Sequence, residues 1–593
     1  MKNLQTLFPF LKQHSVELVI GFVFMLLQNY GFMKVPTYIQ KAVDEISTVN
    51  RLHVILSHLL MILVYTALLV VSMFLMRKLI IGVSRKIEYQ LREKLYQKLL
   101  TVEMAFFLKN ETGDIVSRCT NDVNEVRMLL GPGLMYIPNS LSRLVLFIPI
   151  LFGLSASLLL IILGMLVFVI ALILLTMPRL RPLFRQIQEF LGVINNRVWQ
   201  VIAGMTTIKL YTLESIETER FKDLNQEYIQ RQMQLVKARG LLWPLFIFIF
   251  SLTELFILWI GGSQVIREQM TIGELLQFNV MVGQLTFPVM SLGWVLSLFQ
   301  QGVSALGRIN YILEYPVEQR DDWQSIASET LTFRTRNLSY RYPAHQTETA
   351  AAQLGSDTLD GQVLRQINIT IQPGQTVGIT GTIGSGKTTF INLLTSLYTP
   401  ERGMLFVNEV DIRDIQPESL LKNISIVPQE TFLFSRSIAE NVSLGNNGQV
   451  EMEAVREAVR WAGLESDVIA FPEQYDQVVG ERGITLSGGQ KQRTAIARAL
   501  RKRSPVLIFD DALSSVDANT EARILDNLKS LLSFQTFIIV SHRISALKSA
   551  DVIYVFDQGT IIEQGTHEVL LNKQGLYSKL ARMQQMQMNV EAN

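Results

Sequence analysis

The residues best suited to chemistry form a glycine-rich loop that fits a phosphate-cradling pattern, G-x-x-x-x-G-K-[ST]. The loop follows a β-rich run at residues 376–380 and precedes a helical run. Its glycines let backbone N–H groups face an anion, and the helix start adds partial positive charge. We expect Lys387 to reach the β- and γ-phosphates of ATP and Thr388 to bind Mg²⁺. The predicted nucleotide contacts here are Gly381, Thr382, Gly384, Ser385, Gly386, Lys387, Thr388 and Thr389.

A second candidate is an aspartate at the end of an apolar strand. Residues 506–509 read Val-Leu-Ile-Phe, and Asp510 follows them. A carboxylate at this position is placed to hold Mg²⁺ beside a phosphate loop. Many buried strands end in aspartate, so the pattern supports a nucleotide site only together with the glycine-rich loop.

A third candidate is the pentapeptide Leu-Ser-Gly-Gly-Gln at residues 486–490. Its polar part, Ser487, Gly488, Gly489 and Gln490, opens a helical run and forms a second possible anion site. Ser487 follows Lys387 by about 100 residues and precedes Asp510 by about 23. At these spacings the pentapeptide resembles the signature of the ABC transporter ATPases. In that family the signature caps the γ-phosphate of ATP held by the other subunit's phosphate loop.

Further segments match this family in the expected order. Tyr342 matches the aromatic residue that stacks on adenine, and Gln429 matches the glutamine that reaches Mg²⁺ and the attacking water. His542 matches the histidine that senses the γ-phosphate. Residues 479–483 resemble an exporter segment that contacts the membrane domain, and residues 514–517 resemble the loop that contacts the second ATPase domain.

The resemblance has one informative departure. The residue after Asp510 is normally Glu in this family, where it polarises the attacking water, but here it is Asp511. A displacement of about 1 Å at a reacting centre can cost on the order of 10²-fold in rate. Either Asp511 suffices for hydrolysis, or this chain carries the weak ATP site of a heterodimer. We favour the heterodimer, because the sequence resembles the Asp-bearing subunits of heterodimeric bacterial multidrug exporters.

Composition places part of the chain in lipid. Of its 593 residues, 49% are hydrophobic and 18% are charged, whereas soluble domains carry about 25% charged residues. The net charge of +2 gives no indication of a nucleic-acid partner, and the single Cys119 can form no internal disulfide. Six stretches are candidates for the roughly 20 apolar residues of a spanning helix. They are residues 18–39, 55–76, 137–152, 158–177, 241–262 and 275–299.

The loops between these stretches predict the orientation. Residues 77–136 and 178–240 form loops of about 60 residues with about ten Lys and Arg each, while the other connections are short. The positive-inside rule puts both long loops and both termini in the cytoplasm. The resemblance to bacterial exporters implies that the membrane is a bacterial inner membrane. Helical apolar spacing in the loops predicts that the spanning helices continue beyond the bilayer. Breaks at residues 112–114 and 203–206 predict short crossing helices at the tips.

The predicted fold is an all-α membrane domain of six helices with long cytoplasmic extensions, followed by an α/β ATPase domain with a largely parallel sheet. The expected boundaries are residues 1–313 for the membrane domain, 314–330 for a linker, 331–582 for the ATPase and 583–593 for a polar tail. Residues 345–364 are expected to form an exposed loop. Segments near residues 111–127 and 203–216 resemble the two coupling segments of exporters, which lie in grooves of the ATPase domains.

Polar residues inside the spans are candidates for substrate contact. Glu254 lies in the fifth span, and an ionisable residue inside the bilayer is a functional candidate by default. It either pairs with a cationic drug or bonds to a neighbouring helix. Asn279 and Gln284 in the last span are expected to face a cavity.

The resemblance implies ATP-driven export of amphipathic small molecules or lipids, with ATP and Mg²⁺ as cofactors and a second half-transporter as partner. A homodimeric exporter or lipid flippase remains an alternative. So does a regulatory subunit in which ATP binding gates a partner. The six spans exclude a soluble ATPase, and the fused ATPase domain and long helical loops make an importer less favourable.

Overall fold

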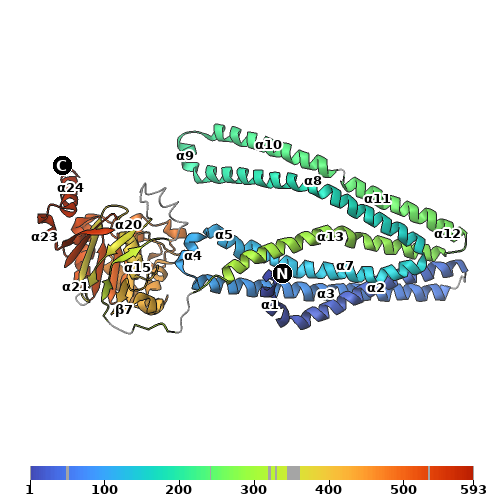
Figure 1. Ribbon diagram of the computed structural model, residues 1–593, viewed down its shortest axis with the longest axis horizontal. Coiled ribbons are helices and arrows are strands. Elements are labelled where there is room, and N and C mark those ends of the chain that lie inside the picture. The colour runs from blue at the N-terminus through green and yellow to red at the C-terminus, as the bar shows by residue number, and fades with distance from the viewer. Residues whose placement is uncertain are drawn as a thin grey trace. The chain divides into compact units, whose positions relative to one another are not determined.

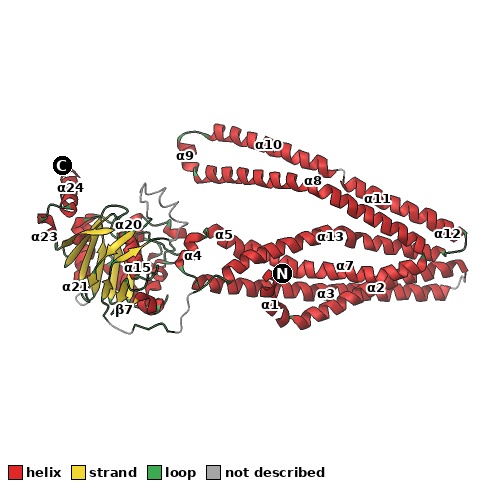
Figure 2. Cartoon of the chain, viewed as in Figure 1, coloured by secondary structure: helices red, strands yellow, loops and turns green. Residues whose placement is uncertain are grey.

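The computed structural model describes residues 2–48, 52–240, 242–317, 322–326, 330–342, 361–531 and 535–591. The chain divides into two compact units. Unit 1 comprises Met1–Leu100 and Val116–Tyr315, and unit 2 comprises Thr101–Ile115 and Pro316–Asn593. Among the described residues, unit 1 is helical and all strands belong to unit 2 (Figure 2). This is the predicted order of a helical domain followed by an α/β domain.

Long helices build unit 1. They are α2 (Ser15–Thr48), α3 (Leu52–Thr101), α7 (Leu134–Leu154), α8 (Ala156–Ala203), α10 (Glu214–Gly240), α11 (Leu242–Phe256) and α13 (Ile272–Leu313). Helix α3 has 50 residues and α8 has 48. At 1.5 Å per residue both exceed about 70 Å, roughly twice the hydrocarbon thickness of a bilayer. These lengths agree with the prediction that the spanning helices continue beyond the bilayer. Helix α8 runs antiparallel to α10 and α11 (Figure 1).

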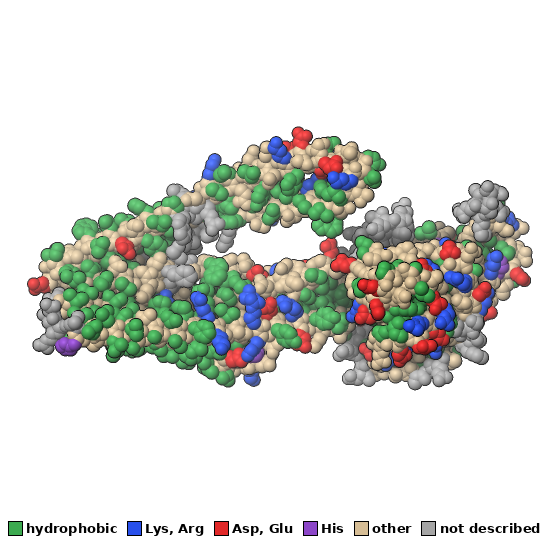
Figure 3. Space-filling view, turned by 180° about the vertical axis from the view of Figure 1, so that it is seen from behind, with side chains coloured by type: hydrophobic (Ala, Val, Ile, Leu, Met, Phe, Trp, Pro, Cys, Tyr) green, Lys and Arg blue, Asp and Glu red, His purple; other side chains and the backbone are tan. Residues whose placement is uncertain are grey.

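Four helical stretches among the described residues are long and apolar enough to cross a bilayer. They are Ser15–Ile46, His53–Thr101, Thr112–Leu154 and Pro244–Ile266. The predicted fourth span overlaps a shorter apolar stretch of α8, Ala156–Val169. The predicted sixth span lies within α13, of which several side chains are outside the described residues. Figure 3 shows apolar side chains covering the part of unit 1 that carries these stretches, with charged side chains gathered on the extensions.

Short elements interrupt the two long loops. They are α4 (Met104–Lys109), α5 (Thr112–Ser117), α6 (Val123–Met128), α9 (Met205–Leu210), and the π-helical turns η2 (Arg118–Asp122) and η3 (Leu129–Gly133). A further π-helical turn, η4 (Ile257–Gly261), lies within the predicted fifth span. The second break falls at Gly204, as predicted, and the short helix α9 follows it. The first break lies earlier than predicted. Thr112 already begins α5, so the short helix at this tip is α4.

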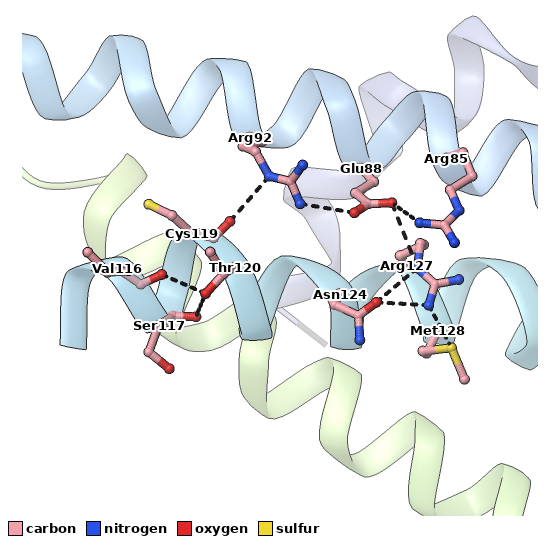
Figure 4. A network of polar contacts seen from close by, with 10 residues as sticks. All are labelled: Arg85, Glu88, Arg92, Val116, Ser117, Cys119, Thr120, Asn124, Arg127 and Met128. Carbon is pink, nitrogen blue, oxygen red and sulfur yellow. Dashed lines mark hydrogen bonds and ion pairs between the residues drawn. The ribbon is translucent and has the colours of Figure 1, made fainter. Parts of the chain in front are cut away.

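A polar network fixes α3 to η2 and α6 beyond the apolar part of α3 (Figure 4). Its centre is Glu88, whose side chain is only 11% exposed. The carboxylate lies 3.0 Å from nitrogens of Arg85 and Arg92 and 3.7 Å from Arg127. Arg92 also donates to the backbone oxygen of Cys119 at 3.4 Å. Arg85 and Arg92 belong to α3 itself, so the contacts that join the helices are those of Glu88 with Arg127 and of Arg92 with the backbone of Cys119.

Unit 2 is organised by a six-stranded sheet in the order β12-β11-β5-β10-β9-β8. The strands are β5 (Thr376–Gly381), β8 (Ile424–Val427), β9 (Val506–Asp510), β10 (Thr536–Val540), β11 (Val552–Asp557) and β12 (Thr560–Gly565). All are parallel except β12, which pairs with β11 in the antiparallel sense. The sequence predicts β-rich runs at residues 376–380, 424–427, 506–509, 536–540 and 552–556, and these coincide with the five parallel strands.

A second, antiparallel sheet has the order β4-β1-β6-β7. Its strands are β1 (Phe333–Thr335), β4 (Thr370–Ile371), β6 (Leu405–Val407) and β7 (Val410–Asp411), and a separate pair joins β2 (Leu338–Tyr340) to β3 (Leu364–Ile367). Strands of two to four residues are too short to show periodicity in the sequence. The predicted exposed loop falls mostly on residues 343–360, outside the described residues.

The buried parallel strands of unit 2 determine where its candidate nucleotide site lies. Every residue of β9 and β10 is buried, which is typical of central parallel strands covered on both faces. Strands β5, β9 and β10 point the same way, so their carboxyl ends meet at one edge of the sheet. In open parallel sheets, ligands bind beside this edge. The predicted nucleotide residues follow these strand ends.

Candidate functional site

The glycine-rich loop joins β5 to helix α15 (Lys387–Leu394). Gly381 has φ +144°, and a Cβ there would lie 1.9 Å from the backbone oxygen of Phe556. Gly386 has φ +92°, and its Cβ would lie 2.6 Å from a side-chain carbon of Leu364. Both positions therefore require glycine, for conformation and for space. The loop can keep its backbone N–H groups turned toward an anion only with this sequence.

Lys387 lies inside the loop and is 7% exposed. Its ammonium donates to the backbone oxygens of Gly381 at 3.2 Å and Thr382 at 2.7 Å, and to Ser385 Oγ at 3.3 Å. Burial lowers the pKa of this ammonium, while the charge of Asp510 opposes the shift. The loop thus orients the cation where a phosphate would lie over the backbone.

Three oxygen-bearing side chains converge beside the loop. Thr388 Oγ1 donates to Gln429 Oε1 and to Asp510 Oδ1, at 3.4 Å in each case. Burial raises the pKa of Asp510 to about 6; the hydrogen bond from Thr388 lowers it, and the charge of Asp511 raises it further. A hydroxyl, an amide oxygen and a carboxylate are ligands suited to a hard divalent cation. The structure brings together the three residues predicted to hold Mg²⁺.

Asp511 follows β9 with φ +49°, and its backbone N–H donates to Val540 O at 2.9 Å. This bond ties the start of the loop after β9 to the end of β10. Burial lowers the pKa of His542; the charge of Lys387 lowers it as well, and that of Asp511 raises it. These electrostatic effects place Lys387, Asp511 and His542 around one region. The predicted catalytic residues are therefore gathered at the carboxyl edge of the sheet.

Tyr342 lies against the helix that follows the loop. Its hydroxyl is 3.0 Å from Thr389 Oγ1. Its ring meets Tyr398 and Tyr340 edge-on, with centroids 5.3 Å apart in both pairs. These contacts fix the ring next to α15, which is the position that a residue stacking on the base of a loop-bound nucleotide needs.

The signature residues form the start of helix α20 (Gly488–Arg501). Ser487 caps this helix, because its Oγ accepts from the backbone N–H of Gln490 at 3.3 Å and Gln490 Oε1 accepts in return at 3.0 Å. Ser487 and Gly488 are exposed. Within the described part of unit 2, no hydrogen bond or ion pair joins them to the glycine-rich loop. The second candidate anion site, at Ser487 and Gly488, is therefore exposed on the surface of unit 2. Among the described residues it is not bonded to the glycine-rich loop.

The structure adds residues that the motif search missed. Arg543 donates to the backbone oxygens of Val516 at 2.8 Å and Ser514 at 2.9 Å, and it pairs with Glu521. Gln492 of α20 accepts from Ser515 N at 2.9 Å and donates to Ser514 Oγ at 3.0 Å. The loop at residues 514–517 is thereby bonded to the His542 segment and to the signature helix. Only the position of Arg543, directly after His542, offered a signal in the sequence.

A further missed residue is Gln584 in helix α24 (Leu576–Glu591). Its side-chain amide donates to His542 O and accepts from Ile544 N at 2.9 Å. One amide thus bonds to the backbone on both sides of Arg543. Nothing in the local pattern around Gln584 indicates this contact, since its partners are about 40 residues away.

The substrate candidates of unit 1 do not form a cluster. Glu254 is exposed on α11, whereas Gln284 and Asn279 are half-buried on α13. No hydrogen bond or ion pair among the described residues joins any two of them. The backbone oxygen of Gln284 instead accepts from Arg143 of α7 at 3.2 Å. Arg143 lies inside the predicted third span, residues 137–152, and nothing in the local sequence indicates this contact.

Comparison with known proteins assigns both parts of the chain. Residues 18–289 match the family model "ABC transporter transmembrane region", and residues 364–514 match the model "ABC transporter". The probable multidrug resistance ABC transporter ATP-binding/permease protein YheI of Bacillus subtilis is 32% identical over 97% of both chains. An ATP-dependent lipid A-core flippase of Syntrophus aciditrophicus is 31% identical over 85% of this chain and 81% of the relative.

A solved structure shares the fold. The structure of a bacterial Atm1-family ABC exporter with ATP bound matches with a TM-score of 0.79 and 25% identity, over 96% of this chain and 99% of that one. The similarity therefore extends over nearly the whole chain. The chain belongs to the ABC transporters, as a half-transporter of the exporter type in which ATP hydrolysis is coupled to transport.

Proposed function

We propose that this chain is one half of a heterodimeric exporter that moves amphipathic small molecules or lipids across a bacterial inner membrane. Residues 1–313 would form the transport domain, residues 314–330 the linker and residues 331–582 the ATPase, with a tail at residues 583–593. Both termini and the ATPase would lie in the cytoplasm. Multidrug transporters and a lipid A-core flippase among the relatives support this range of substrates.

The proposal of a heterodimer rests on Asp511. It occupies the position after β9 where the water-polarising carboxylate is expected, near Lys387 and His542. Its side chain is one methylene shorter than Glu, and its backbone is anchored by the bond to Val540 O. The bond to Val540 O holds this part of the backbone, and a shortfall of about 1 Å at the reacting centre is on the order of a 10²-fold loss in rate.

The other nucleotide residues are retained, so the site should still bind ATP. Lys387 and the loop amides would hold the phosphates, and Tyr342 would stack on adenine. Thr388, Gln429 and Asp510 would hold Mg²⁺, which when bound neutralises charge on the β- and γ-phosphates. His542 would contact the γ-phosphate. This is a site that closes on ATP and hydrolyses it slowly.

The signature would act on the partner's ATP. Ser487, Gly488 and Gly489, with Gln490 behind them, lie at a helix start on the surface of unit 2, without bonds to the chain's own loop. A helix start with free backbone N–H groups binds anions readily. A second half whose equivalent of Asp511 is Glu would then hold the fast site, completed by this chain's signature.

Isolation from native membranes tests this assignment. The tagged chain, purified from its own organism in mild detergent, should bring down a second ABC half in a 1:1 ratio by quantitative mass spectrometry. Inside-out vesicles that hold the complex should accumulate an amphipathic dye with ATP, and Lys387→Ala should bind ATP poorly. Recovery of this chain alone as a dimer would overturn the heterodimer.

A homodimeric exporter is the second candidate, because Asp511 keeps the carboxylate that hydrolysis needs. In that case the signature of each copy would complete the other copy's site, and both sites would turn over equally. Substrate contact is proposed for Glu254, Asn279 and Gln284 in either case. Glu254→Gln should reduce efflux of a cationic dye more than that of a neutral one if Glu254 binds substrate.

A further inference from the structure

An arginine lies buried in the middle of an apolar helix of unit 1. Arg143 belongs to α7 and is 7% exposed. Its guanidinium lies 4.1 Å from the ring centre of Phe32. Nε donates to Asn29 Oδ1 at 3.3 Å, and Nη1 donates to Gln284 O at 3.2 Å. Among the described residues, no carboxylate pairs with Arg143 and no group accepts from its Nη2.

This environment is unusual for a permanent cation. An arginine side chain keeps its charge, and a charge inside the hydrocarbon region loses the solvation that water would give it. The neighbours of Arg143 are an amide, a backbone carbonyl and an aromatic face, which are all neutral. They compensate part of the lost solvation through dipoles, but they supply no counter-charge. The group that would complete the environment of such a buried cation is an anion.

The surrounding polar side chains are arranged around the guanidinium. Asn29 Nδ2 donates to Asn139 Oδ1 at 2.9 Å and to Ser142 Oγ at 2.6 Å. These bonds turn the carbonyl oxygen of Asn29 toward Arg143 and hold the guanidinium in place. The position of the cation is therefore fixed by α2, α7 and α13 together.

Two buried acceptors on α2 and α13 also have no hydrogen-bond partner among the described residues. Gln28, which precedes Asn29 on α2, is 3% exposed, and its Oε1 has no hydrogen bond. Gln284, whose backbone oxygen bonds to Arg143, also has a buried Oε1 without a partner. A buried acceptor without a donor is unfavourable. A ligand that carried hydroxyl or N–H groups beside an acidic group would satisfy both the acceptors and the cation.

The depth of the group fits a transport site. From Arg143 to the end of α7 at Leu154, and from Gln284 to the start of α13 at Ile272, the helices rise about 17–18 Å at 1.5 Å per residue. That is roughly half of a 30 Å hydrocarbon core. An ionisable residue at this depth that faces other helices marks a substrate pathway more often than a structural contact.

We propose that Arg143 binds the acidic head group, a carboxylate or a phosphate, of the amphiphile that this transporter moves. Gln28 and Gln284 accept hydrogen bonds from hydroxyl or amine groups beside that acid. This inference rests on the proposed export function and narrows its substrates to anionic amphiphiles. Arg185 lies on α8, where its side chain is 82% exposed and pairs with Glu189, so Arg185→Gln serves as an independent control.

The test uses the complete transporter, purified with its partner half. The probes are a BODIPY-type dye whose only ionisable group is a carboxylate, the methyl ester of the same dye, and a fluorescent phosphatidylglycerol. In proteoliposomes, Arg143→Gln should lower ATP-dependent transport of the acid at least about tenfold and leave the ester within about twofold. Arg143→Lys should retain part of the acid transport, because an ammonium keeps the charge without the planar fork. Arg185→Gln, the same exchange at an exposed arginine of α8, should leave transport of the acid unchanged.

Binding is measured separately from transport. In detergent, the acid should raise the thermal unfolding midpoint of the wild-type complex and leave that of Arg143→Gln unchanged. If the acid binds but is not transported, the anion site at Arg143 stands and the proposed export function is wrong. Equal loss of acid and ester transport, or no stabilisation of the wild type by either acidic probe, would overturn the anion site, as expected if Arg143 only joins helices or meets a carboxylate of the partner. A response to the phospholipid alone would assign the anion to lipid.

Discussion

The chemistry of the nucleotide site depends on the state of one carboxyl group. Burial raises the pKa of Asp510 to about 6, whereas an ordinary aspartate titrates near 3.9. Between about pH 4 and 6 this group is therefore protonated when an exposed aspartate would be ionised. A metal ligand must be deprotonated, so protons compete with Mg²⁺ at this oxygen.

We therefore expect the Mg²⁺-dependent part of ATP affinity to weaken as the pH falls below about 6. With one proton in competition, the loss should approach about tenfold in Mg²⁺ affinity per pH unit. The measurement is titration of the purified chain with fluorescent ATP at pH 7.5, 6.5 and 5.5, with and without Mg²⁺. Asp510→Asn should remove the Mg²⁺ effect at every pH. A Mg²⁺ effect that stays constant down to pH 5 would contradict the role given to Asp510.

Residues within one local pattern could be recognised in the sequence, and residues joined across the fold could not. Gly381 and Gly386 belong to one short loop, so the spacing of the motif alone indicates that glycine is required at both positions. The partners of Arg143 lie more than 100 residues away on two other helices. No periodicity in α7 distinguishes an arginine that interrupts a span from one held between three helices.

At the scale of elements, helix α24 bears on the catalytic segment through Gln584. The two amide bonds hold the backbone on both sides of Arg543, next to His542. We expect Gln584→Ala to lower kcat about tenfold, equivalent to about 1.4 kcal/mol of activation free energy. ATP affinity should change less than twofold, because the loop at Gly381 is untouched.

The assay is ATP hydrolysis in the Asp511→Glu background, in which we expect this site to turn over. Gln585→Ala is the matched control, since Gln585 is the exposed neighbour on the same helix. A fall in kcat with Gln584→Ala and none with Gln585→Ala supports a positioning role. An equal effect of the two substitutions, or a change in ATP affinity alone, would argue against it.

In unit 1, an ion pair joins η2 to the end of α13. Arg308 donates to both carboxylate oxygens of Asp122, at 2.8 and 2.6 Å, and the Asp122 side chain is 8% exposed. Because bonds between charged groups are strong when buried, Asp122→Asn should reduce stability by about 1.5–3 kcal/mol. The readout is the midpoint of thermal unfolding in detergent, followed by tryptophan fluorescence. The double exchange Asp122→Arg with Arg308→Asp should restore part of the loss, and an unchanged midpoint in Asp122→Asn would contradict this account.

Element prediction succeeded where the pattern was long. Strands β5, β8, β9, β10 and β11 are apolar runs between helices, and all five were recognised. Strands β1, β4, β6 and β7 are at most three residues long, and their pairing depends on contacts distant in the sequence. The first loop break was placed too late because Gly113 was taken as a helix breaker, whereas it lies within the first turn of α5. A glycine is tolerated there at a small cost in helix stability.

At the scale of the whole molecule, the chain carries the parts of two incomplete ATP sites. The glycine-rich loop and the signature are both formed, yet the described residues of unit 2 contain no bond between them. Relatives that match over nearly the full length and an Atm1-family exporter structure show the same set of domains. A half-transporter of this kind needs a second half, and the sequence predicted that requirement from the signature alone. We propose that the second half is a Glu-bearing partner, because this chain carries Asp511.

The most direct test of that point is ATP turnover by this chain purified alone, beside the same chain with Asp511→Glu. We predict that the wild type is nearly silent and that Asp511→Glu raises kcat by about 10²-fold, because the longer side chain brings the carboxylate to the attacking water. This result would mark the native site as the weak member of a heterodimer. Brisk turnover by the wild type as a homodimer, with little gain from Asp511→Glu, would contradict the account.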